Sequence, residues 1–269
     1  KACLEANWPQ LDAAIALIES RQHEGMRITV DRYPYLASYT SLDAQLPDWC
    51  YDGGNRQEMT RLKDPEVRRK IMDELSDFPH FDRLMVTDAS VCKETEGERI
   101  TDAARKRGCT PAEAYLDILV ENHLDVGGVF FQMNEENLLR VLRLPCCVVG
   151  SDASAENIQK DREGGHPRKF GTFARFLQQY AEKIGGMETA VAMTSSRTAE
   201  IFGIRDRGKI AEGFFADITV FDRKKIRDCS DYEHPRRYAS GFVHVLVNGV
   251  PEIRDCVFTG RLAGRVLEK

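Results

Sequence analysis

The sequence predicts an α/β fold, in which helices alternate with buried strands, and a small β domain at its carboxyl end. Residues 144–152 are mostly small and β-branched without polar alternation and end on a carboxylate, which suits a strand of a parallel sheet covered by helices on both faces. Residues 203–269 are rich in strand patterns, and Asn248-Gly249 is a hairpin signal. We therefore place a domain boundary near Phe202.

Composition and charge argue against several kinds of partner. The chain has 269 residues and a formal net charge of −5 with mixed signs, which gives no electrostatic reason to expect nucleic acid or an anionic membrane surface as a partner. No apolar segment reaches the roughly 20 residues that span a bilayer, and the first residues lack a signal-peptide layout. The eight cysteines form no C-x-x-C pairs, which favours free thiols over disulfides or a cysteine zinc site. We therefore expect a cytoplasmic protein without nucleic-acid or membrane partners.

The first predicted elements are a helix and a strand. Apolar residues recur at helical spacing through residues 9–24, and Gly25 ends the helix. The β-rich strand that follows ends at Pro34, which lacks a backbone donor for the ladder. A helix joined to a strand by a tight glycine link is the second half of a β/α repeat. The apolar positions of the helix are Leu11, Ala14, Ile15 and Ile18.

Residues 36–125 do not follow the β/α pattern and are interpreted as an insertion. Their strongest local signal is the N-cap Thr110, followed by Pro111 at the first helical position and by Glu113 three residues after the cap. This helix is predicted to run to about Asn122. Other elements expected here and just beyond are a helix at 65–76, strands at 83–87 and 126–133, and a helix capped by Asn134.

The stretch after residue 152 begins with a polar loop and continues with helices. A well-patterned helix that includes Phe173 stops at Gly185-Gly186, and two shorter helices follow before Gly203. The strands expected in the tail lie at residues 208–210, 216–222 and 243–247.

Asp152 is the first candidate functional residue, because it lies at the carboxyl end of the buried strand. In α/β barrels the loops at this end meet at one mouth and carry the catalytic groups. The alternative is that Asp152 starts a turn, since the sequence Ser-Asp-Ala-Ser favours turns. The residues alone leave both interpretations open.

Four stretches in order carry a resemblance to a known family. They are Asp-Arg-Tyr-Pro-Tyr at residues 31–35, Val-Gly-Ser-Asp at 149–152, His-Pro-Arg-Lys-Phe-Gly-Thr-Phe at 166–173, and the run from Gly208 to Asp222. With them the chain resembles the carboxyl-terminal part of the N-acyl-D-amino-acid deacylases (D-aminoacylases) of the amidohydrolase superfamily. The last stretch is common to many amidohydrolases, whereas the His-Pro-Arg stretch is specific to the deacylases.

The resemblance implies a fold with more detail than the pattern gives. It is the carboxyl-terminal portion of a (β/α)8 TIM-type barrel with an inserted segment, followed by a small carboxyl-terminal β-sandwich domain. Residues 1–202 would form the barrel portion, with residues 36–125 inserted, and residues 203–269 the β domain. A partial barrel leaves sheet edges uncovered, so we expect a missing amino-terminal half, and a homo-oligomer is a further expectation.

The resemblance also implies Zn²⁺ as a cofactor. Family members hold zinc with a His-x-His pair, a Cys and two further His, and these motifs are absent from this sequence. The six histidines of the chain have no metal-ligand spacing among them. Lys1 is similar to the lysine of the family's final Ser-His-x-Lys motif. We therefore expect the main zinc ligands in sequence that precedes Lys1, with Asp152 as a further metal contact.

The catalytic roles implied by the resemblance fall to Asp152 and Tyr33. Asp152 would act first as general base and then as general acid for amide hydrolysis, beside a zinc-bound water whose pKa is lowered toward roughly 7. Tyr33 would hold the carbonyl oxygen as negative charge develops, because a phenol is a strong neutral donor. The alternative for Tyr33 is packing at a strand end, and Tyr35 is interpreted as the packed tyrosine of the pair.

The substrate-binding roles implied by the resemblance fall to Arg168 and Lys1, which would bind the α-carboxylate of an N-acyl-amino acid. The alternative for Arg168 is an ion pair with a loop acid such as Asp161 or Glu163. His166 is expected to support Arg168. Tyr39 stands where many relatives have a small residue, so it is expected to narrow the side-chain pocket. The four substrate-binding candidates are Lys1, Tyr39, His166 and Arg168.

The function implied by the resemblance is zinc-dependent hydrolysis of the amide bond of N-acyl-D-amino acids, which releases a carboxylate and a D-amino acid. Hydrophobic D-amino acids, D-Glu and D-Asp all remain open as substrates. One alternative is another amidohydrolase, similar to a hydantoinase or dihydroorotase, although the His-Pro-Arg stretch favours a linear substrate that carries a carboxylate. The other alternative is a metal-free ligand-binding homologue.

Overall fold

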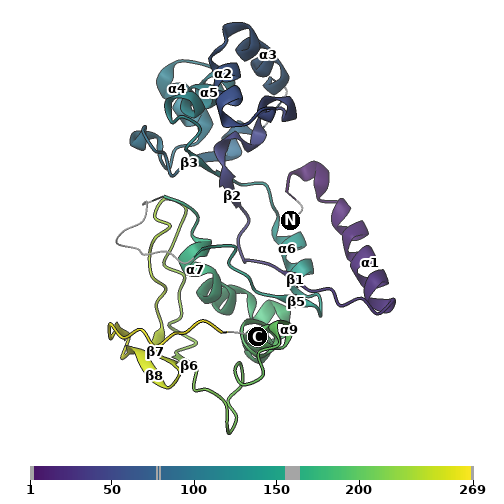
Figure 1. Ribbon diagram of the computed structural model, residues 1–269, viewed down its shortest axis with the longest axis vertical. Helices are drawn as coiled ribbons and strands as arrows, with labels where there is room; N and C mark the ends of the chain where they lie inside the picture. Colours follow the sequence, from purple (N-terminus) through teal and green to yellow (C-terminus); the bar gives the residue numbers. More distant parts are fainter. Residues whose placement is uncertain (1–2, 77, 79, 155–163, 268–269) are drawn as a thin grey trace.

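The computed structural model describes residues 3–76, 78, 80–154 and 164–267. They form a mixed α/β structure with three regions, which are a central body, a helical lobe and a β sheet at the carboxyl end (Figure 1). The body contains β1 (Val30–Asp31), β5 (Cys147–Val148), α1 (Gln10–His23), α6 (Glu135–Leu142), α7 (Arg168–Arg175), α8 (Met187–Thr194) and α9 (Ser196–Phe202).

The body is built on a parallel pair of strands. Val30 pairs with Cys147 and Asp31 with Val148, and both β5 residues are buried under α6 and α8. The buried parallel strand predicted before residue 152 is therefore confirmed. A (β/α)8 barrel closes only when its strands pair around a full circle. Among the described residues β1 and β5 are the only parallel strands, so the predicted barrel is not closed here.

The insertion is a lobe with its own core. Its elements are β2 (Ser38–Ser41), α2 (Asn55–Lys63), α3 (Pro65–Leu75), β3 (Leu84–Thr87), α4 (Ile100–Arg107), α5 (Pro111–Glu121) and β4 (Gly127–Phe130). The strands form an antiparallel sheet in the order β2-β4-β3. A Cβ on Gly127 would lie 2.9 Å from the ring of Tyr39, so glycine lets this ring cross the sheet. The strand predicted at 126–133 thus belongs to the sheet of the lobe.

The tail forms one antiparallel sheet. Its strands are β6 (Ile218–Phe221), β7 (Phe242–Val247), β8 (Val250–Arg254) and β9 (Val257–Phe258). A β-sandwich was predicted, but the described part of the tail contains a single sheet, because the segments before β6 and after β9 add no strand to a second layer. Ile226, Phe221 and Phe242 pack into the same core as Phe176 and Leu177 of the body, so the sheet is attached to the body through apolar contacts.

Two general features accompany the fold. All eight cysteines are free thiols, as the spacing predicted, and Cys147 is fully buried as part of the core. Within the described ranges, no helix combines the length and the apolar character needed to cross a bilayer.

Candidate functional site

Asp152 follows β5 in an unusual backbone conformation. Its φ is 51°, in the left-handed region that aspartate tolerates better than most non-glycine residues. Two residues earlier, a Cβ on Gly150 would lie 2.3 Å from Oδ2 of Asp31. Only glycine therefore lets the segment after β5 lie this close to the Asp31 side chain. The Asp152 side chain is 47% exposed. The end of β5 therefore presents a carboxylate to its surroundings, as the position after a buried strand predicted.

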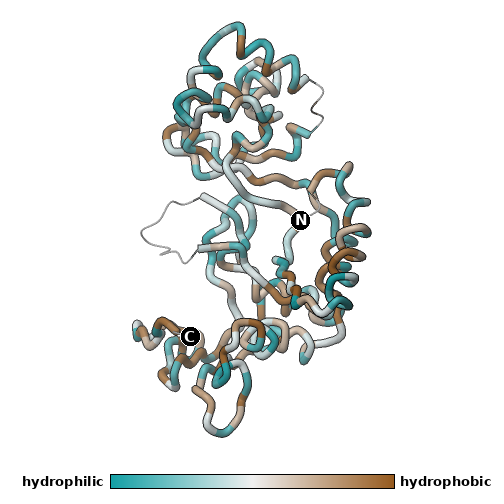
Figure 2. The backbone as a smooth tube through the Cα atoms, turned by 45° about the vertical axis from the view of Figure 1, so that its right-hand side comes forward, coloured by the Kyte–Doolittle hydropathy of each residue, from teal (hydrophilic) through white to brown (hydrophobic). Residues whose placement is uncertain are grey.

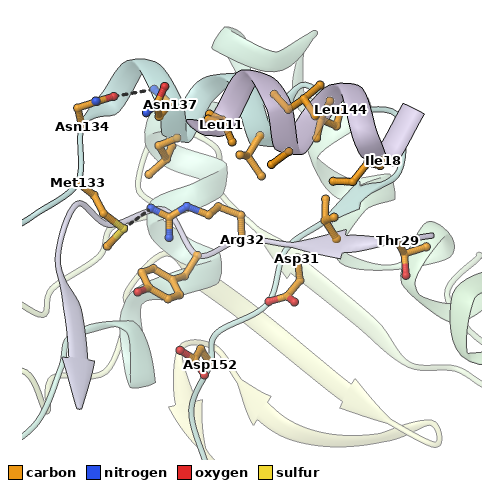
Figure 3. Close-up of a pocket in the computed structure, with 16 residues that line it drawn as sticks. Leu11, Ile18, Thr29, Asp31, Arg32, Met133, Asn134, Asn137, Leu144 and Asp152 are labelled. Carbon is orange, nitrogen blue, oxygen red and sulfur yellow. Dashed lines mark hydrogen bonds between the residues drawn. The ribbon is translucent and has the colours of Figure 1, made fainter. Parts of the chain in front are cut away.

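The cavity beside Asp152 has a volume of about 530 Å³. Asp31 and Asp152 lie along one side, while apolar side chains of α1, such as Leu11 and Ile18, lie along the other (Figure 3). Hydrophobic and hydrophilic residues alternate along α1 in the tube view (Figure 2), as the spacing predicted, yet none of its described residues is buried. The apolar face of α1 thus lines an open cavity.

Arg168 begins α7 and reaches Asp152. Its Nη2 lies 3.1 Å from Oδ2 of Asp152, and the Arg168 side chain is only 6% exposed. Within the described part of the chain, Nε and Nη1 of Arg168 have no hydrogen-bond acceptor. The predicted alternative partners, Asp161 and Glu163, lie outside the described residues, as does Lys1. Arg168 is therefore a buried cation. Its Nη2 pairs with the candidate base, Asp152, while Nε and Nη1 have no acceptor among the described residues.

Two guanidinium groups lie close to the ring of Tyr33. The Arg168 Cζ lies 4.8 Å from the centre of the Tyr33 ring, and the Arg32 Cζ lies 4.6 Å from it. Arg32 is fixed by donation from Nη2 to the backbone oxygen of Tyr35 at 3.1 Å and by contact with the sulfur of Met133 (Figure 3). Tyr33 is buried and lines the cavity. Packing and a donor role are compatible, because cation–π contacts with two guanidinium groups help fix the orientation of the ring.

His166 is fully buried behind Arg168. Its Nδ1 accepts a hydrogen bond from the backbone N–H of Arg168 at 3.0 Å. Nε2 must then carry the proton, which it donates to the backbone oxygen of Ala37 at 3.0 Å. Both ring nitrogens are therefore used to fix the backbone at the start of α7. This geometry fits the predicted support of Arg168 and leaves neither nitrogen for proton transfer to a substrate.

Tyr39 joins the site from the lobe. Its hydroxyl donates to Oδ2 of Asp88, and its ring lies 5.8 Å from Cζ of Arg168. Next to Asp88, the hydroxyl oxygen of Thr87 accepts from the backbone N–H of Gly165 at 2.6 Å. The lobe thus holds the glycines that precede His166, and Tyr39 lies near Arg168 but is not among the residues that line the cavity beside Asp152.

Sequence reasoning did not identify Arg32 or Asp88 as site residues. Arg32 gave no signal, because its role depends on Met133, which lies 101 positions along the chain. Asp88 carried a signal that could have been used. Like Asp152, it follows a buried apolar strand, β3, and has a positive φ of 49°.

The described residues do not form a metal site by themselves. Among them, no three His, Cys, Asp or Glu side chains lie close enough to share an ion, whereas a zinc site with four ligands takes at least three from protein in enzymes. Asp152 is a candidate for a single ligand. The donor set of the described chain therefore does not fit a complete zinc centre.

Comparison with known proteins shows which family the chain resembles. A family model described as "Amidohydrolase family" matches residues 182–252. A D-aminoacylase of Alcaligenes xylosoxydans xylosoxydans is 35% identical over 97% of this chain and 44% of its own length. The chain thus spans about half the length of the curated relatives it matches.

Solved structures are also similar to this chain. A D-aminoacylase crystal structure matches 99% of this chain and 48% of its own, with a TM-score of 0.74 and 28% identity. The N-acyl-D-glutamate deacylase of Bordetella bronchiseptica, complexed with zinc and a phosphonate inhibitor, matches 93% of this chain and 44% of its own, with a TM-score of 0.70 and 27% identity. Residues 182–252 of this chain therefore match the amidohydrolase family, and the chain as a whole is similar to D-aminoacylases over about half of their length.

Proposed function

We propose that this chain provides the general base and the carboxylate-binding side of an enzyme that hydrolyses the amide bond of N-acyl-D-amino acids. The observation that carries the proposal is the Arg168 guanidinium, which is buried, pairs with Asp152 through Nη2 and has two donor nitrogens, Nε and Nη1, without an acceptor in the described chain. Buried donors are costly when unpaired. A substrate carboxylate would accept from them, and guanidinium is the side chain best suited to that anion.

The chemistry follows from what lies around Arg168. Asp152, at the cavity, can take a proton from the attacking water as its oxygen bonds to the amide carbon. The same carboxyl then returns the proton to nitrogen as the C–N bond breaks, so the products are a carboxylate and an amine. The Tyr33 hydroxyl can donate to the carbonyl oxygen during the step. Arg168 orients the base and the substrate carboxylate together.

The metal of the whole enzyme belongs to the same proposal. The similar glutamate deacylase structure is a complex with zinc, and a similar D-aminoacylase has a binuclear metal centre. We propose Zn²⁺ with Asp152 as this chain's contribution and the remaining ligands from residues outside those described.

The open cavity supports a further part of the proposal. Its wall on α1 is apolar, and the parallel pair β1-β5 is extended by no further strand in the described chain. Unpaired strand edges and uncovered apolar faces are unfavourable in water. We propose that a second half of the barrel closes this cavity, together with the substrate.

The test compares two substrates that differ only in the carboxylate, N-acetyl-D-methionine and its C-terminal amide. The intact protein should prefer the acid, and Arg168→Met should reduce this preference roughly 100-fold in kcat/KM, because a charge-assisted pairing is lost. Arg143→Met is the matched control, since Arg143 is an exposed arginine whose side chain donates to the backbone oxygen of Lys183, away from Asp152.

Three outcomes would contradict the proposal. If Arg168→Met keeps the wild-type preference for the acid over the amide, Arg168 does not bind the substrate carboxylate. Hydrolysis of a cyclic amide such as dihydroorotate, in place of the linear acid, would favour a ring-opening amidohydrolase. Binding of the acid without turnover by the intact, zinc-supplied protein would favour a ligand-binding homologue. Equal rates for the D and L forms would remove the stereochemical part alone.

A further inference from the structure

The connection between β6 and β7 reaches the site from the carboxyl-terminal sheet. Its base is closed by an isolated antiparallel bridge between Arg227 and Ser240, and from there it extends away from the sheet toward α7 (Figure 1). Two of its side chains, Asp228 and Tyr232, touch residues of the catalytic region. A loop of the β domain therefore contributes to the surroundings of His166.

Asp228 is buried against the start of α7. Its side chain is 2% exposed, and its Oδ2 accepts a hydrogen bond from the Tyr35 hydroxyl at 2.7 Å and lies 3.5 Å from Nη1 of Arg175. A Cβ on Gly171 would lie 2.0 Å from Oδ1 of Asp228 and 2.3 Å from the Tyr35 hydroxyl oxygen. The glycine of the His-Pro-Arg-x-x-Gly stretch is thus the residue that lets this carboxylate reach α7.

Tyr35 and Tyr232 together enclose the His166 ring. Both rings meet it edge to face, with centroids 5.2 Å away and interplanar angles of 88° and 87°. Burial and the nearby Asp228 carboxylate raise the pKa of Tyr35 far above its usual range, so its hydroxyl stays a donor at any working pH. The Tyr35 hydroxyl also lies 3.3 Å from the backbone oxygen of Pro167. The segment 166–168 is therefore held from both sides.

We propose that Asp228 and Tyr232 are positioning residues for Arg168. Asp228 fixes Tyr35, and Tyr35 and Tyr232 fix the ring of His166, whose Nδ1 holds the backbone of Arg168. The carboxyl-terminal sheet then takes part in binding the substrate carboxylate, because its β6–β7 connection positions Arg168. This inference rests on the proposed function, because it assigns to the loop a role in substrate-carboxylate recognition.

The test measures KM and kcat separately in the intact protein. Tyr232→Ala and Asp228→Asn should each raise KM for N-acetyl-D-methionine about 10-fold with kcat changed less than about 2-fold, because a supporting contact is lost while the base is kept. The C-terminal amide of the substrate should show no such rise in KM. Tyr232→Phe should restore wild-type values, because the contact with His166 is made by the ring.

The matched control is Asp231→Asn. Asp231 lies on the same connection, but its side chain is 52% exposed and pairs with His234 and Arg237. Its removal should leave KM unchanged. Equal rises in KM for Asp228→Asn and Asp231→Asn, or no rise in Tyr232→Ala, would overturn the inference.

A second measurement separates this inference from the proposed function. Nitrogen NMR of the histidine rings should show His166 with its proton on Nε2 in the wild type and a changed tautomer population in Tyr232→Ala. If the wild type hydrolyses no N-acyl-amino acid, the proposed function fails while this readout still reports on His166. An unchanged His166 spectrum in Tyr232→Ala would overturn the positioning role whatever the activity.

Discussion

At the scale of single residues, the site depends on glycines that let polar groups approach one another. Gly150 admits the Asp31 carboxylate beside the backbone that leads to Asp152, and Gly171 admits Asp228 and the Tyr35 hydroxyl. The two positions differ from glycines that only end helices, since an added methyl group would overlap side-chain oxygen atoms. At Gly171 these oxygens, of Asp228 and Tyr35, cannot move without breaking their own hydrogen bonds.

Gly171→Ala tests this idea. A Cβ 2.0 Å from Oδ1 of Asp228 should lower the free energy of unfolding by about 2 kcal/mol, the typical cost of overpacking a buried site. Urea denaturation measures the loss. Gly264→Ala is the control, because a Cβ there meets nothing within 4 Å. Equal stability of the two variants would show that α7 and Asp228 separate freely.

Glu58 gives a prediction about pH. It lies 2% exposed on α2, and burial followed by the charge of Asp43 raises its pKa from 4.5 to about 7. Between these values the folded state binds more protons than the unfolded state, so the contribution of Glu58 to the free energy of unfolding falls as pH rises. Across this window the loss is on the order of 3 kcal/mol.

Glu58→Gln should remove this dependence, since the amide does not titrate. The stability of the variant relative to wild type should therefore rise from pH 4.5 to pH 8, as measured by urea unfolding at several pH values. Glu136→Gln serves as the control, because Glu136 is exposed on α6. A constant difference between Glu58→Gln and wild type at all pH values would show that Glu58 titrates normally.

At the scale of elements, local signals predicted the helices with clear end signals, whereas α2 and α4 were not predicted. The start of α5 is a capping box, in which Thr110 accepts from the backbone N–H of Glu113 and the Glu113 carboxylate accepts from the backbone N–H of Thr110. The predicted helix start is thereby confirmed. The ends of α5 and α9, at Asn122 and Gly203, also agree with the sequence, because caps depend on neighbouring residues alone.

Thr110→Ala should lower the free energy of unfolding by about 1 kcal/mol, the usual cost of losing an N-cap side chain. Thr110→Ser should retain most of the stability, because serine keeps the accepting oxygen. Thermal unfolding measures both variants. A loss in Thr110→Ser as large as that in Thr110→Ala would show that the methyl group, and not the cap, stabilises α5.

The candidate site was predictable where its residues end strands or lie in a local motif. Asp152, Tyr33 and Arg168 could be named from the sequence, and the structure brings them into contact. The contributions of Arg32, Asp88, Asp228 and Tyr232 could not be named, because they depend on partners far along the chain. The sheet order of the lobe was unpredictable for the same reason, since strand pairing is a long-range property.

At the scale of the whole molecule, the described residues offer an incomplete metal site. No cluster of three metal-ligating side chains occurs among them. The 269-residue chain studied alone should therefore retain well under one zinc ion per chain after dialysis against metal-free buffer, as measured by elemental analysis. Stoichiometric zinc in the isolated chain would show that residues outside the described ranges, or a rearrangement, complete the site.

The cavity beside Asp152 is bordered by separate elements of the molecule. One wall comes from α1, and the opposite side carries Asp31 and Asp152 (Figure 3). The lobe and the carboxyl-terminal sheet both send side chains to the segment around His166. The site is thus supported by all three regions of the molecule, and a substrate would meet it from the open side.

The most direct test of the central claim is the hydrolysis of N-acetyl-D-methionine by the intact protein, compared with Asp152→Asn. If Asp152 is the general base beside Arg168, the wild type turns the substrate over and the variant loses at least about 100-fold in kcat, the usual contribution of a positioned acid or base, while still binding the substrate. Turnover in Asp152→Asn equal to wild type would contradict the account, because the carboxylate at the end of β5 would then take no part in the reaction.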